Sequence, residues 1–553
     1  MKTEKQLIHK ETMLGQNENL NKLLEDYSKA IPEKVALLEH LIDLVKHTPS
    51  IENLKNLANA VHKLAGNAGL YGYLEVSSLC KAFEKDLLET IETKTPFAPK
   101  DYLDRISKAF RKNFLNESLS TKITSHLAKV ATIGLGYTGL SLLEAFGEKG
   151  FPLLGYDYDE KKIENLKKGE SYYNFTSVSN FSSWIQTKQC MISSDSSILA
   201  EADVIIICVT TSLDDHHLPD TSAIYNAFST VATYLKPGQL IILQSTIYPG
   251  ATEKGLLPLL EKSNLTVGKD FFLAYVPEIS DPGNPDYSLT KIPKIISGIT
   301  PSCLEMTKLL YETIGCHTFS CASTEVAEAA KLLQNTYRLI NISFINEMKI
   351  AFDRMGLDVW QVIEAAATKP FGFTPFYPSP GIGGDCIPVV PAYLSWEARE
   401  TNAPTSLIDC AITINASIPY YVVEKVGEAL NTIKKSFSEA KILILGVGYK
   451  QNLNDIRESA SLPIISLLQK KSAHVEYHDP HVANISSPRH YPDMRLSSIN
   501  FSAEALASYD VVVIATDHSF YNWDEIARHS RLIIDTRNVM TSIPASRGKT
   551  IKA

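Results

Sequence analysis

The chain has 553 residues, 44% of them hydrophobic and 21% charged, so it is too long for one ordinary core and too apolar for a disordered chain. A formal charge of -8 gives no general positive field, and we therefore expect no nucleic-acid partner. The eight cysteines include no C-x-x-C pair, which favours a reducing compartment over a disulfide framework or a zinc finger.

The apolar runs are short. Val204–Val209, for example, has the length of a strand, far below the roughly 18 residues that a membrane span needs. The polar, lysine-containing N-terminus lacks the apolar middle of a signal peptide. We therefore expect a cytoplasmic protein with no membrane partner.

The first part of the chain has a helical pattern. In residues 18–116, apolar side chains recur at three- and four-residue steps, as in Leu37, Leu38 and Leu41, and turn residues divide the run into about four helices. This pattern predicts an all-α four-helix bundle within residues 1–117. The polar stretch at 118–127 is predicted to be a linker.

The rest of the chain alternates between strands and helices. Val130–Ile133, Val204–Val209 and Leu240–Leu243 alternate with amphipathic segments, which predicts an α/β domain with a parallel sheet over residues 128–322. A long helical stretch, from about residue 324 through 367, lies in a central domain at 323–425. A second α/β domain is expected at 426–553, with strands near residues 441–446, 475–477, 511–515 and 532–535. The predicted fold is thus two Rossmann-like doubly wound domains joined by a long helical domain and preceded by the helical bundle.

A glycine motif follows the first of these strands. Gly134, Gly136 and Gly139 lie between the strand and an apolar helix, and Asp157 ends the next apolar run. The first glycine permits a tight turn, the second admits a pyrophosphate, and the third lets helix and strand pack closely. An acid at 157 accepts hydrogen bonds from a ribose, which favours NAD over NADP. The alternative is a glycine turn in an ordinary βα unit with a surface aspartate.

Other residues with chemical potential lie in loops and on one helix. Cys386 lies in a loop rich in glycine and proline, where it is either a nucleophile or a thiol with no chemical role. Lys331 and Asn335 lie at i and i+4, so they point the same way, although Lys331 could instead form a surface ion pair with Glu328. Glu278 lies in a loop after a strand, where ligand-contacting groups of such sheets gather.

Nine strings, in order, carry a family resemblance. They are G-L-G-Y-T-G-L from residue 134, Q-S-T-I-Y-P-G from 244, P-E-I-S-D-P-G-N from 277, A-K-L-L-Q-N-T-Y-R from 330, T-K-P-F-G-F-T-P-F-Y-P from 368, G-G-D-C-I-P from 383, G-V-G-Y-K from 446, D-I-R-E-S from 455 and D-T-R-N from 535. Residues 128–553 resemble the UDP-glucose/GDP-mannose dehydrogenase family, most of all its UDP-N-acetylglucosamine 6-dehydrogenase branch.

The resemblance implies a reaction. Such enzymes oxidise the primary alcohol of a nucleotide sugar to a carboxylate in two NAD-dependent steps, through a cysteine thioester. Cys386 is then the nucleophile, and Lys331 and Asn335 stabilise oxyanions. Glu278 acts through a water molecule that Thr246 helps to hold. The aromatic loop from Phe371 to Tyr377 suggests a UDP-N-acetylhexosamine as substrate.

The same resemblance implies the binding residues. For NAD these are Gly134, Gly136, Tyr137, Gly139, Asp157, Thr210, Thr246 and Arg457, the last reaching across an interdomain cleft. For the UDP-sugar they are Phe376, Tyr377, Gly381, Gly383, Lys450 and Arg537. The resemblance also implies a homodimer that pairs through the long helix near residues 324–355.

Several positions depart from the family pattern. Val390 occupies the place of an aspartate that supports the cysteine, and Asp385 replaces a histidine or serine before the nucleophile. A negative charge at 385 disfavours a thiolate if it points inward. The further changes are Ile279 for an arginine, Gln244 for a glutamate, Ser379 for a glycine, and Thr210-Thr211-Ser212 for Pro-Thr-Pro. An alternative to the enzyme is therefore an impaired dehydrogenase-like module that acts as a phosphorelay or sensor protein.

The helical N-terminus contains His62 beside the small residues Ala65, Gly66, Ala68 and Gly69. This surround resembles a histidine phosphotransfer (HPt) domain, although Ala65 replaces a frequent lysine. The resemblance implies that His62 accepts phosphate from a response-regulator receiver domain or a hybrid kinase. A structural histidine is the alternative, as is a bundle that serves only for docking. His474, His478 and His481 lie in a strand and the turn after it, so we predict no metal site there.

Overall fold

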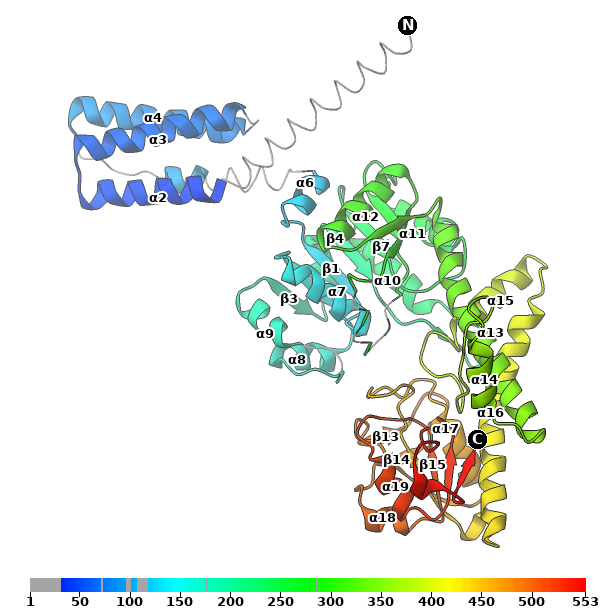
Figure 1. The fold of residues 1–553 in the computed structure, drawn as a ribbon. Helices are drawn as coiled ribbons and strands as arrows, with labels where there is room; N and C mark the ends of the chain where they lie inside the picture. Colours follow the sequence, from blue (N-terminus) through cyan, green and yellow to red (C-terminus); the bar gives the residue numbers. More distant parts are fainter. Residues whose placement is uncertain are drawn as a thin grey trace. The chain divides into compact units, whose positions relative to one another are not determined.

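The computed structural model describes residues 31–70, 73–95, 101–106, 118–174, 178–279, 281, 283–284, 286–287 and 289–553. The chain divides into two compact units, residues 1–128 and residues 129–553. The first unit is helical, and the second contains two parallel-type sheets with helices between and around them (Figure 1).

The first unit contains α2 (Ile31–His47), α3 (Ile51–Leu70) and α4 (Leu74–Thr93), and residues 102–106 are also helical. Apolar side chains at helical spacing, such as Leu38, Ile42 and Val45, form a common core with side chains of α3 and α4. Tyr102 stacks on Phe83, with ring centroids 4.6 Å apart. The expected bundle is therefore present, while residues 18–30, 71–72, 96–100 and 107–116 of the predicted helical run lie outside the described residues.

The predicted linker at 118–127 contains a short helix and directly precedes the boundary between the two compact units. α6 (Leu119–Thr124) begins after Ser118, whose Oγ accepts a hydrogen bond from the Thr121 backbone N–H. Leu119 and Ile123, four residues apart, are both buried. A serine cap and one apolar pair are sufficient for this turn and a half of helix.

The first sheet has eight strands in the order β10-β9-β8-β7-β4-β1-β2-β3. In chain order these are β1 (Val130–Ile133), β2 (Leu153–Tyr156), β3 (Cys190–Ser193), β4 (Val204–Ile207), β7 (Leu240–Leu243), β8 (Phe272–Tyr275), β9 (Lys294–Gly298) and β10 (Thr318–Ser320). All neighbours are parallel except β8 and β9. The chain order reverses between β1 and β4, and ligands of doubly wound sheets bind at such a switch point.

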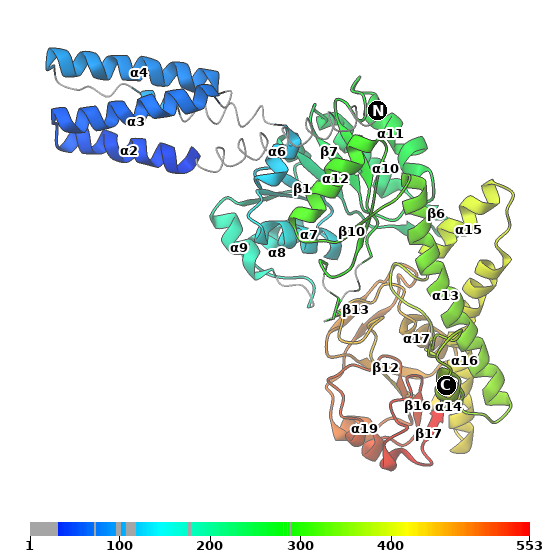
Figure 2. The same ribbon diagram turned by 45° about the horizontal axis from the view of Figure 1, so that its top comes forward.

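Helices cover this sheet on both faces (Figure 2). They are α7 (Tyr137–Glu148), α8 (Glu160–Lys168), α9 (Ser179–Gln186), α10 (Ser222–Tyr234), α11 (Leu257–Glu261) and α12 (Pro301–Thr313), with a 3-10 turn at Ser196–Glu201, a π turn at Ala251–Leu256 and a hairpin of β5 (Ser212–Leu213) and β6 (Pro219–Asp220). The central strands β1, β4 and β7 are buried at every residue, which explains their continuous apolar sequences.

The central helices are α13 (Thr324–Arg354), α14 (Val359–Ala367), α15 (Val390–Glu400) and α16 (Ser406–Thr432). α13 and α16 run side by side and connect the two sheet domains (Figures 1 and 2). The predicted helical stretch through 367 is two helices, because Asp358 caps a new one by accepting from the Trp360 N–H. α16 is long and apolar enough to cross a membrane by length and composition alone, a test that core helices also pass.

The second sheet has five parallel strands in the order β12-β11-β15-β16-β17. They are β11 (Lys441–Leu445), β12 (His474–His478), β15 (Val511–Ile514), β16 (Ile533–Asp535) and β17 (Thr550–Lys552), accompanied by α17 (Ser461–Lys470), α18 (Ala503–Ala507), α19 (Trp523–His529), 3-10 turns at Phe437–Glu439 and Pro544–Ser546, and a hairpin of β13 (Asn484–Ser486) and β14 (Arg495–Ser497). Apolar cores lie on both faces of this sheet. The predicted strands at 441–446, 475–477, 511–515 and 532–535 are confirmed within one or two residues at each end.

Candidate active site

The glycine motif forms a tight loop between β1 and α7. Gly134 has φ +92°, and a Cβ there would lie 2.6 Å from the Cys208 carbonyl oxygen. Gly136 is the N-cap of α7, so the free N–H groups of that helix face the loop. Gly139 is buried, and its Cβ would lie 2.0 Å from the Gly134 carbonyl oxygen. The loop therefore has the form that a pyrophosphate requires.

Asp157 follows β2 and is buried, which excludes the alternative of a surface aspartate. One carboxylate oxygen accepts hydrogen bonds from the Leu135 N–H at 2.8 Å and from Lys162 Nζ at 3.1 Å. These contacts fix the carboxylate beside the glycine loop. It lies where a ribose would reach it, so the residues present fit NAD.

One cleft of about 850 Å³ joins this loop to the central helices and to the second sheet. Most of the predicted site residues line it, namely Gly134, Gly136, Tyr137, Asp157, Thr210, Thr246, Glu278, Lys331, Tyr377, Gly381, Gly383, Cys386, Lys450, Arg457 and Arg537. Gly139, Asn335 and Phe376 do not. Gly139 packs helix against loop, and Phe376 packs beside Ile345 and Val359, with its ring 5.8 Å from that of Tyr337.

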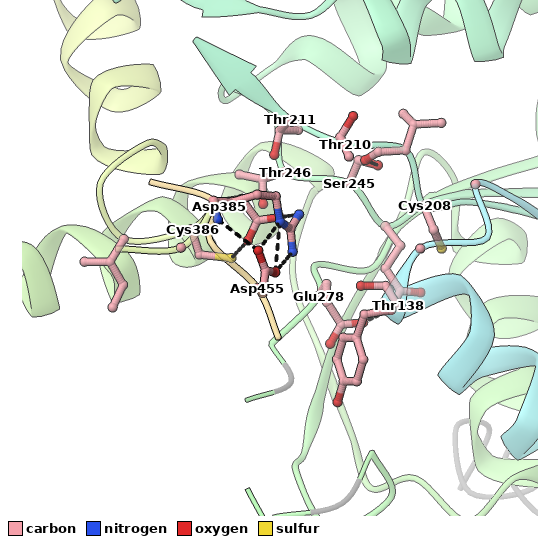
Figure 3. A pocket seen from close by; sticks show the side chains of 18 of the residues that line it. Thr138, Cys208, Thr210, Thr211, Ser245, Thr246, Glu278, Asp385, Cys386 and Asp455 are labelled. Carbon is pink, nitrogen blue, oxygen red and sulfur yellow. Dashed lines mark hydrogen bonds and ion pairs between the residues drawn. The ribbon is translucent and has the colours of Figure 1, made fainter. Parts of the chain in front are cut away.

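Cys386 lies in the loop that precedes α15 and is exposed to the cleft (Figure 3). Its thiol donates to the Asp385 carboxylate, with Sγ 3.5 Å from Oδ1. The other Asp385 oxygen accepts from the guanidinium of Arg457, whose Nε donates to the Asp455 carboxylate at 2.9 Å. A carboxylate therefore lies between the Cys386 thiol and the cation that was expected to reach NAD.

This arrangement affects the ionisation of the thiol. Desolvation by the surrounding protein, followed by the negative charge of Asp385, raises the pKa of Cys386 to about 12, while Lys331 and Arg457 act in the opposite direction. Because the thiol faces an open cleft, water weakens the desolvation, and the Asp385 contribution is the one that a substitution can test. Burial opposes the charge of Arg457, but its hydrogen bonds with Asp455 and the charge of Asp385 raise its pKa.

Val390 is buried four residues after Cys386, where its N–H donates to the Cys386 carbonyl at 2.8 Å. Its side chain belongs to an apolar cluster with Leu332, Val389 and Tyr393. The position that carries an aspartate in the family is therefore part of a small core here, and it supplies no proton acceptor.

Lys331 is 6% exposed and lines the cleft from α13. The alternative of a surface ion pair with Glu328 was wrong, because Glu328 is buried and accepts hydrogen bonds from Gly250 and Thr252. Asn335, one turn further, is also buried, and its Nδ2 has no hydrogen-bond partner among the described residues. An amide donor with unused capacity is thus held next to the lysine.

The residues predicted for the nucleotide end lie on loops of the second sheet and near the first. Lys450 Nζ is 2.6 Å from the Asp281 carboxylate, which belongs to the first sheet domain. Arg537 follows β16, and its Nε donates to the Ala515 carbonyl at 2.9 Å. Tyr377 stacks on Trp360, with ring centroids 5.5 Å apart. These side chains line the same cleft as the glycine loop.

Sequence reasoning missed three further cleft residues. Arg338 lies on the same face of α13 as Lys331, seven residues or two helical turns further on, and this spacing predicts that it lines the cleft. Tyr449 packs on the glycine pair before Cys386, where a Cβ at Gly384 would lie 2.9 Å from its ring. Asp455 fixes Arg457. Both lie in the strings from 446 and 455, but only Asp455 acts locally, two residues from Arg457, whereas Tyr449 acts through a contact with a distant loop.

Two loops from the opposite sheet domains also meet beside this cleft, which the adjacent residues Tyr173 and Asp455 line. The Asn174 N–H donates to Asn454 Oδ1 at 3.3 Å, and the Asn454 N–H donates to Asn174 Oδ1 at 3.2 Å. Asn174 Nδ2 donates to the Asn452 carbonyl, and Asn454 Nδ2 to that of Tyr172. We call this set of four hydrogen bonds the asparagine latch.

In the first unit, His62 projects from α3 with 73% of its side chain exposed. Its Nδ1 is 2.9 Å from Glu84 Oε1 on α4, which leaves Nε2 directed away from that contact. A Cβ at Gly66, one turn further along α3, would meet nothing within 4 Å, so the space beside the imidazole is open.

Comparison with known proteins agrees with this geometry. Three family models of the UDP-glucose/GDP-mannose dehydrogenase family match the chain: the NAD binding domain at residues 128–315, the central domain at 325–417 and the UDP binding domain at 443–542. The Hpt domain model matches residues 22–108.

Among curated relatives, UDP-N-acetyl-D-glucosamine 6-dehydrogenase of Pseudomonas aeruginosa is 34% identical over 393 residues, 71% of this chain and 90% of that protein. Protein CapL of Staphylococcus aureus is 32% identical over 422 residues, 75% of this chain and 96% of CapL. The solved UDP-D-ManNAc dehydrogenase of Pyrococcus horikoshii superposes with a TM-score of 0.69 at 30% identity, covering 77% of this chain and 98% of that one.

Fold and cleft together define a dinucleotide-binding protein with two Rossmann domains and a cysteine between them. The chain belongs to the UDP-glucose/GDP-mannose dehydrogenase family, its cofactor is NAD, and it carries an Hpt domain at its N-terminal end.

Proposed function

We propose that the protein oxidises C6 of a UDP-hexose, in particular a UDP-N-acetylhexosamine, to a uronate through a thioester on Cys386. The observation that carries this proposal is the single cleft that brings the glycine loop, Cys386 and the basic residues of the second sheet together. NAD supplies the hydride acceptor for each of two oxidations. Two of the relatives named above, UDP-N-acetyl-D-glucosamine 6-dehydrogenase and UDP-D-ManNAc dehydrogenase, have names that specify N-acetylhexosamine substrates, which supports this choice of sugar.

The site residues have different roles in the proposed oxidation. In the first oxidation the substrate alcohol loses a hydride to NAD and a proton to the water held by Glu278 and Thr246. The Cys386 thiolate then adds to the aldehyde, and loss of a second hydride leaves the thioester. Water cleaves the thioester to a carboxylate and a thiol. Lys331 and Asn335 stabilise the oxyanions that form at C6. Lys450 and Arg537 hold the diphosphate end of the substrate, for which their positive charges are suited.

A spectrophotometric assay tests this reaction. Purified full chain with NAD and UDP-N-acetylglucosamine, UDP-N-acetylmannosamine or UDP-glucose should form two NADH per sugar. Cys386→Ser should abolish the second oxidation, whereas Cys410→Ser, which changes another exposed cysteine, should leave the rate unchanged. Absence of NADH with all three sugars would reject the proposal.

A second candidate function is an impaired dehydrogenase module that binds its ligands but stalls. The Asp385 carboxylate beside the thiol and the apolar packing of Val390 support it. Mass spectrometry of the protein after mixing with NAD and UDP-sugar distinguishes the two candidates. An accumulating adduct on Cys386 supports the stalled module, whereas steady NADH formation without one supports the enzyme.

We further propose that His62 accepts a phosphoryl group from a receiver domain. Its exposure and the Glu84 contact to Nδ1 support this role, since a hydrogen bond to Nδ1 leaves Nε2 as the nucleophile. A phosphorylated receiver domain should transfer label to the wild type and to His40→Ala, a change at another exposed histidine, but not to His62→Ala. Equal labelling of all three proteins would exclude His62.

We also propose a homodimer that forms through the central helices. Leu333, Tyr337 and Phe344 are all more than half exposed and share one face of α13, on which Leu333 and Phe344 are 11 residues apart. A row of large apolar side chains on a long helix favours a partner surface.

The eight free cysteines are consistent with the reducing cytoplasm that we propose as the location of the protein.

A further inference from the structure

A buried lysine lies beside the proposed site but outside the cleft wall. Lys294 is the first residue of β9, and its side chain is 1% exposed. Its Nζ has no hydrogen-bond partner among the described residues, yet it lies 3.5 Å from Glu278 Oε1. An ammonium group is rarely buried in this way unless an opposite charge stabilises it.

The sheet register explains why these two residues meet. β8 and β9 are antiparallel, with Ala274 paired to Gly298 and Tyr275 to Ser297. Continuing this pairing by three residues beyond Tyr275 places Glu278 opposite Lys294, where facing side chains are close neighbours. The ion pair is therefore a cross-strand pair at the edge of the cleft.

A second contact orients the same carboxylate. The Tyr311 hydroxyl donates to Gln244 Oε1 at 2.9 Å, so the amide Nε2 of Gln244 faces Glu278 and donates to Oε2 at 2.5 Å. Each carboxylate oxygen of Glu278 thus has a fixed donor or cation on the protein side. The side chain is 18% exposed and lines the cleft.

The charge balance favours an ionised carboxylate. Among the described residues, the ionisable side chains that also interact with Glu278 include Tyr137 of α7, Cys208 after β4, Tyr311 of α12 and Cys316 before β10. For each of them burial is the largest cause of a raised pKa, so all four are neutral. Lys294 supplies positive charge in this group. Because Lys294 is almost entirely out of water, removing the charge of Glu278 leaves its ammonium buried without a counter-ion.

We propose that Lys294 is a positioning residue that, together with Gln244, holds the Glu278 carboxylate ionised and directed into the cleft as a proton acceptor. This inference rests on the role proposed above for Glu278, but two of its tests do not require turnover.

Infrared difference spectra of the full chain provide the first test, with Glu278→Gln as the reference that identifies the Glu278 band. Between about pH 5 and 8 the wild type should show the carboxylate band, and Lys294→Met should show the carbonyl band of a carboxylic acid growing as the pH falls. A carboxylate band in Lys294→Met across this whole range would overturn the proposal.

Thermal unfolding provides the second test and remains informative if Lys294→Met folds poorly. Glu278→Gln strands the buried ammonium, so its midpoint should fall below that of the wild type. The double variant Glu278→Gln/Lys294→Met removes both charges and should melt above Glu278→Gln. A double variant no more stable than the single one would refute the pairing.

Turnover adds a third test. The acid limb of the pH profile of kcat/KM should move upward by about one pH unit or more in Lys294→Met and return toward the wild type in Lys294→Arg. Lys308→Met changes an exposed lysine that pairs with Glu312 on α12, and it should match the wild type. An unmoved acid limb in Lys294→Met would contradict the role. If the wild type forms no NADH, the infrared and melting results still decide the pairing, and only the reaction proposed above fails.

Discussion

Replacing Asp385 by serine tests whether the carboxylate beside the nucleophile keeps the thiol protonated. One carboxylate oxygen of Asp385 is 3.5 Å from Cys386 Sγ, and the other accepts a hydrogen bond from Arg457. Serine retains a small polar side chain but removes the negative charge. The variant should therefore ionise its thiol at lower pH than the wild type.

The expected size follows from Coulomb's law. Two unit charges at this separation repel by about 2.4 kcal/mol at an effective dielectric constant of about 40, a value suited to a cleft open to water. The guanidinium of Arg457 is present in both proteins, so its attraction for the thiolate cancels in this comparison. Screening closer to that of bulk water, at an effective dielectric constant of about 70, sets the lower bound of the difference at about 1.4 kcal/mol. That difference corresponds to a roughly tenfold larger thiolate fraction at a fixed pH below the pKa.

Alkylation measures the thiolate directly and needs neither substrate nor turnover. Iodoacetamide should modify Cys386 about tenfold faster in Asp385→Ser than in the wild type at pH 8, when labelling is followed on the Cys386 peptide by mass spectrometry. Cys410 is also exposed, and its labelling in the same samples serves as an internal reference. Asp524→Ser, an exposed aspartate on α19, is the matched control and should leave the Cys386 rate unchanged. Equal or slower alkylation in Asp385→Ser would refute the electrostatic reasoning.

Three other predictions follow from separate parts of the molecule. Asn174→Ala removes two side-chain hydrogen bonds of the asparagine latch. It should raise KM for NAD roughly three- to tenfold without lowering kcat. An unchanged KM would show that the latch does not help to hold the cofactor. Burial lowers the pKa of His478 to about 4, so the unfolded chain binds a proton near pH 6.5 that the folded protein does not bind. In denaturant titrations the free energy of unfolding should therefore fall by about 3 kcal/mol between pH 6.5 and 4. His478→Gln should lose this pH dependence. Leu333→Glu/Phe344→Glu should convert a dimer to a monomer in light scattering, whereas Gln334→Glu, with the same charge beside that face, should remain dimeric.

Local sequence patterns were sufficient for the elements and for much of the site. Buried parallel strands such as Leu240–Leu243 are continuous apolar runs, so their positions can be found without the fold. The glycine loop, Asp157 and Cys386 were identifiable because a tight turn, a strand end and a glycine-rich loop each leave a local signature. The short helix in the predicted linker was missed because six residues are too few for a clear period.

Contacts between distant segments required the tertiary structure. Asp385 meets Arg457 across 72 residues, and Asn174 meets Asn454 across 280. Lys294 lies opposite Glu278 only because two strands pair in one particular register. Val390 occupies an apolar cluster built by α13 and α15. A periodic pattern reports which face of one element is buried, but it contains no information on which other element covers that face. The chain therefore encodes its nucleotide-binding motifs locally, while the charge environment of its thiol and of Glu278 is decided by how the strands and loops are brought together.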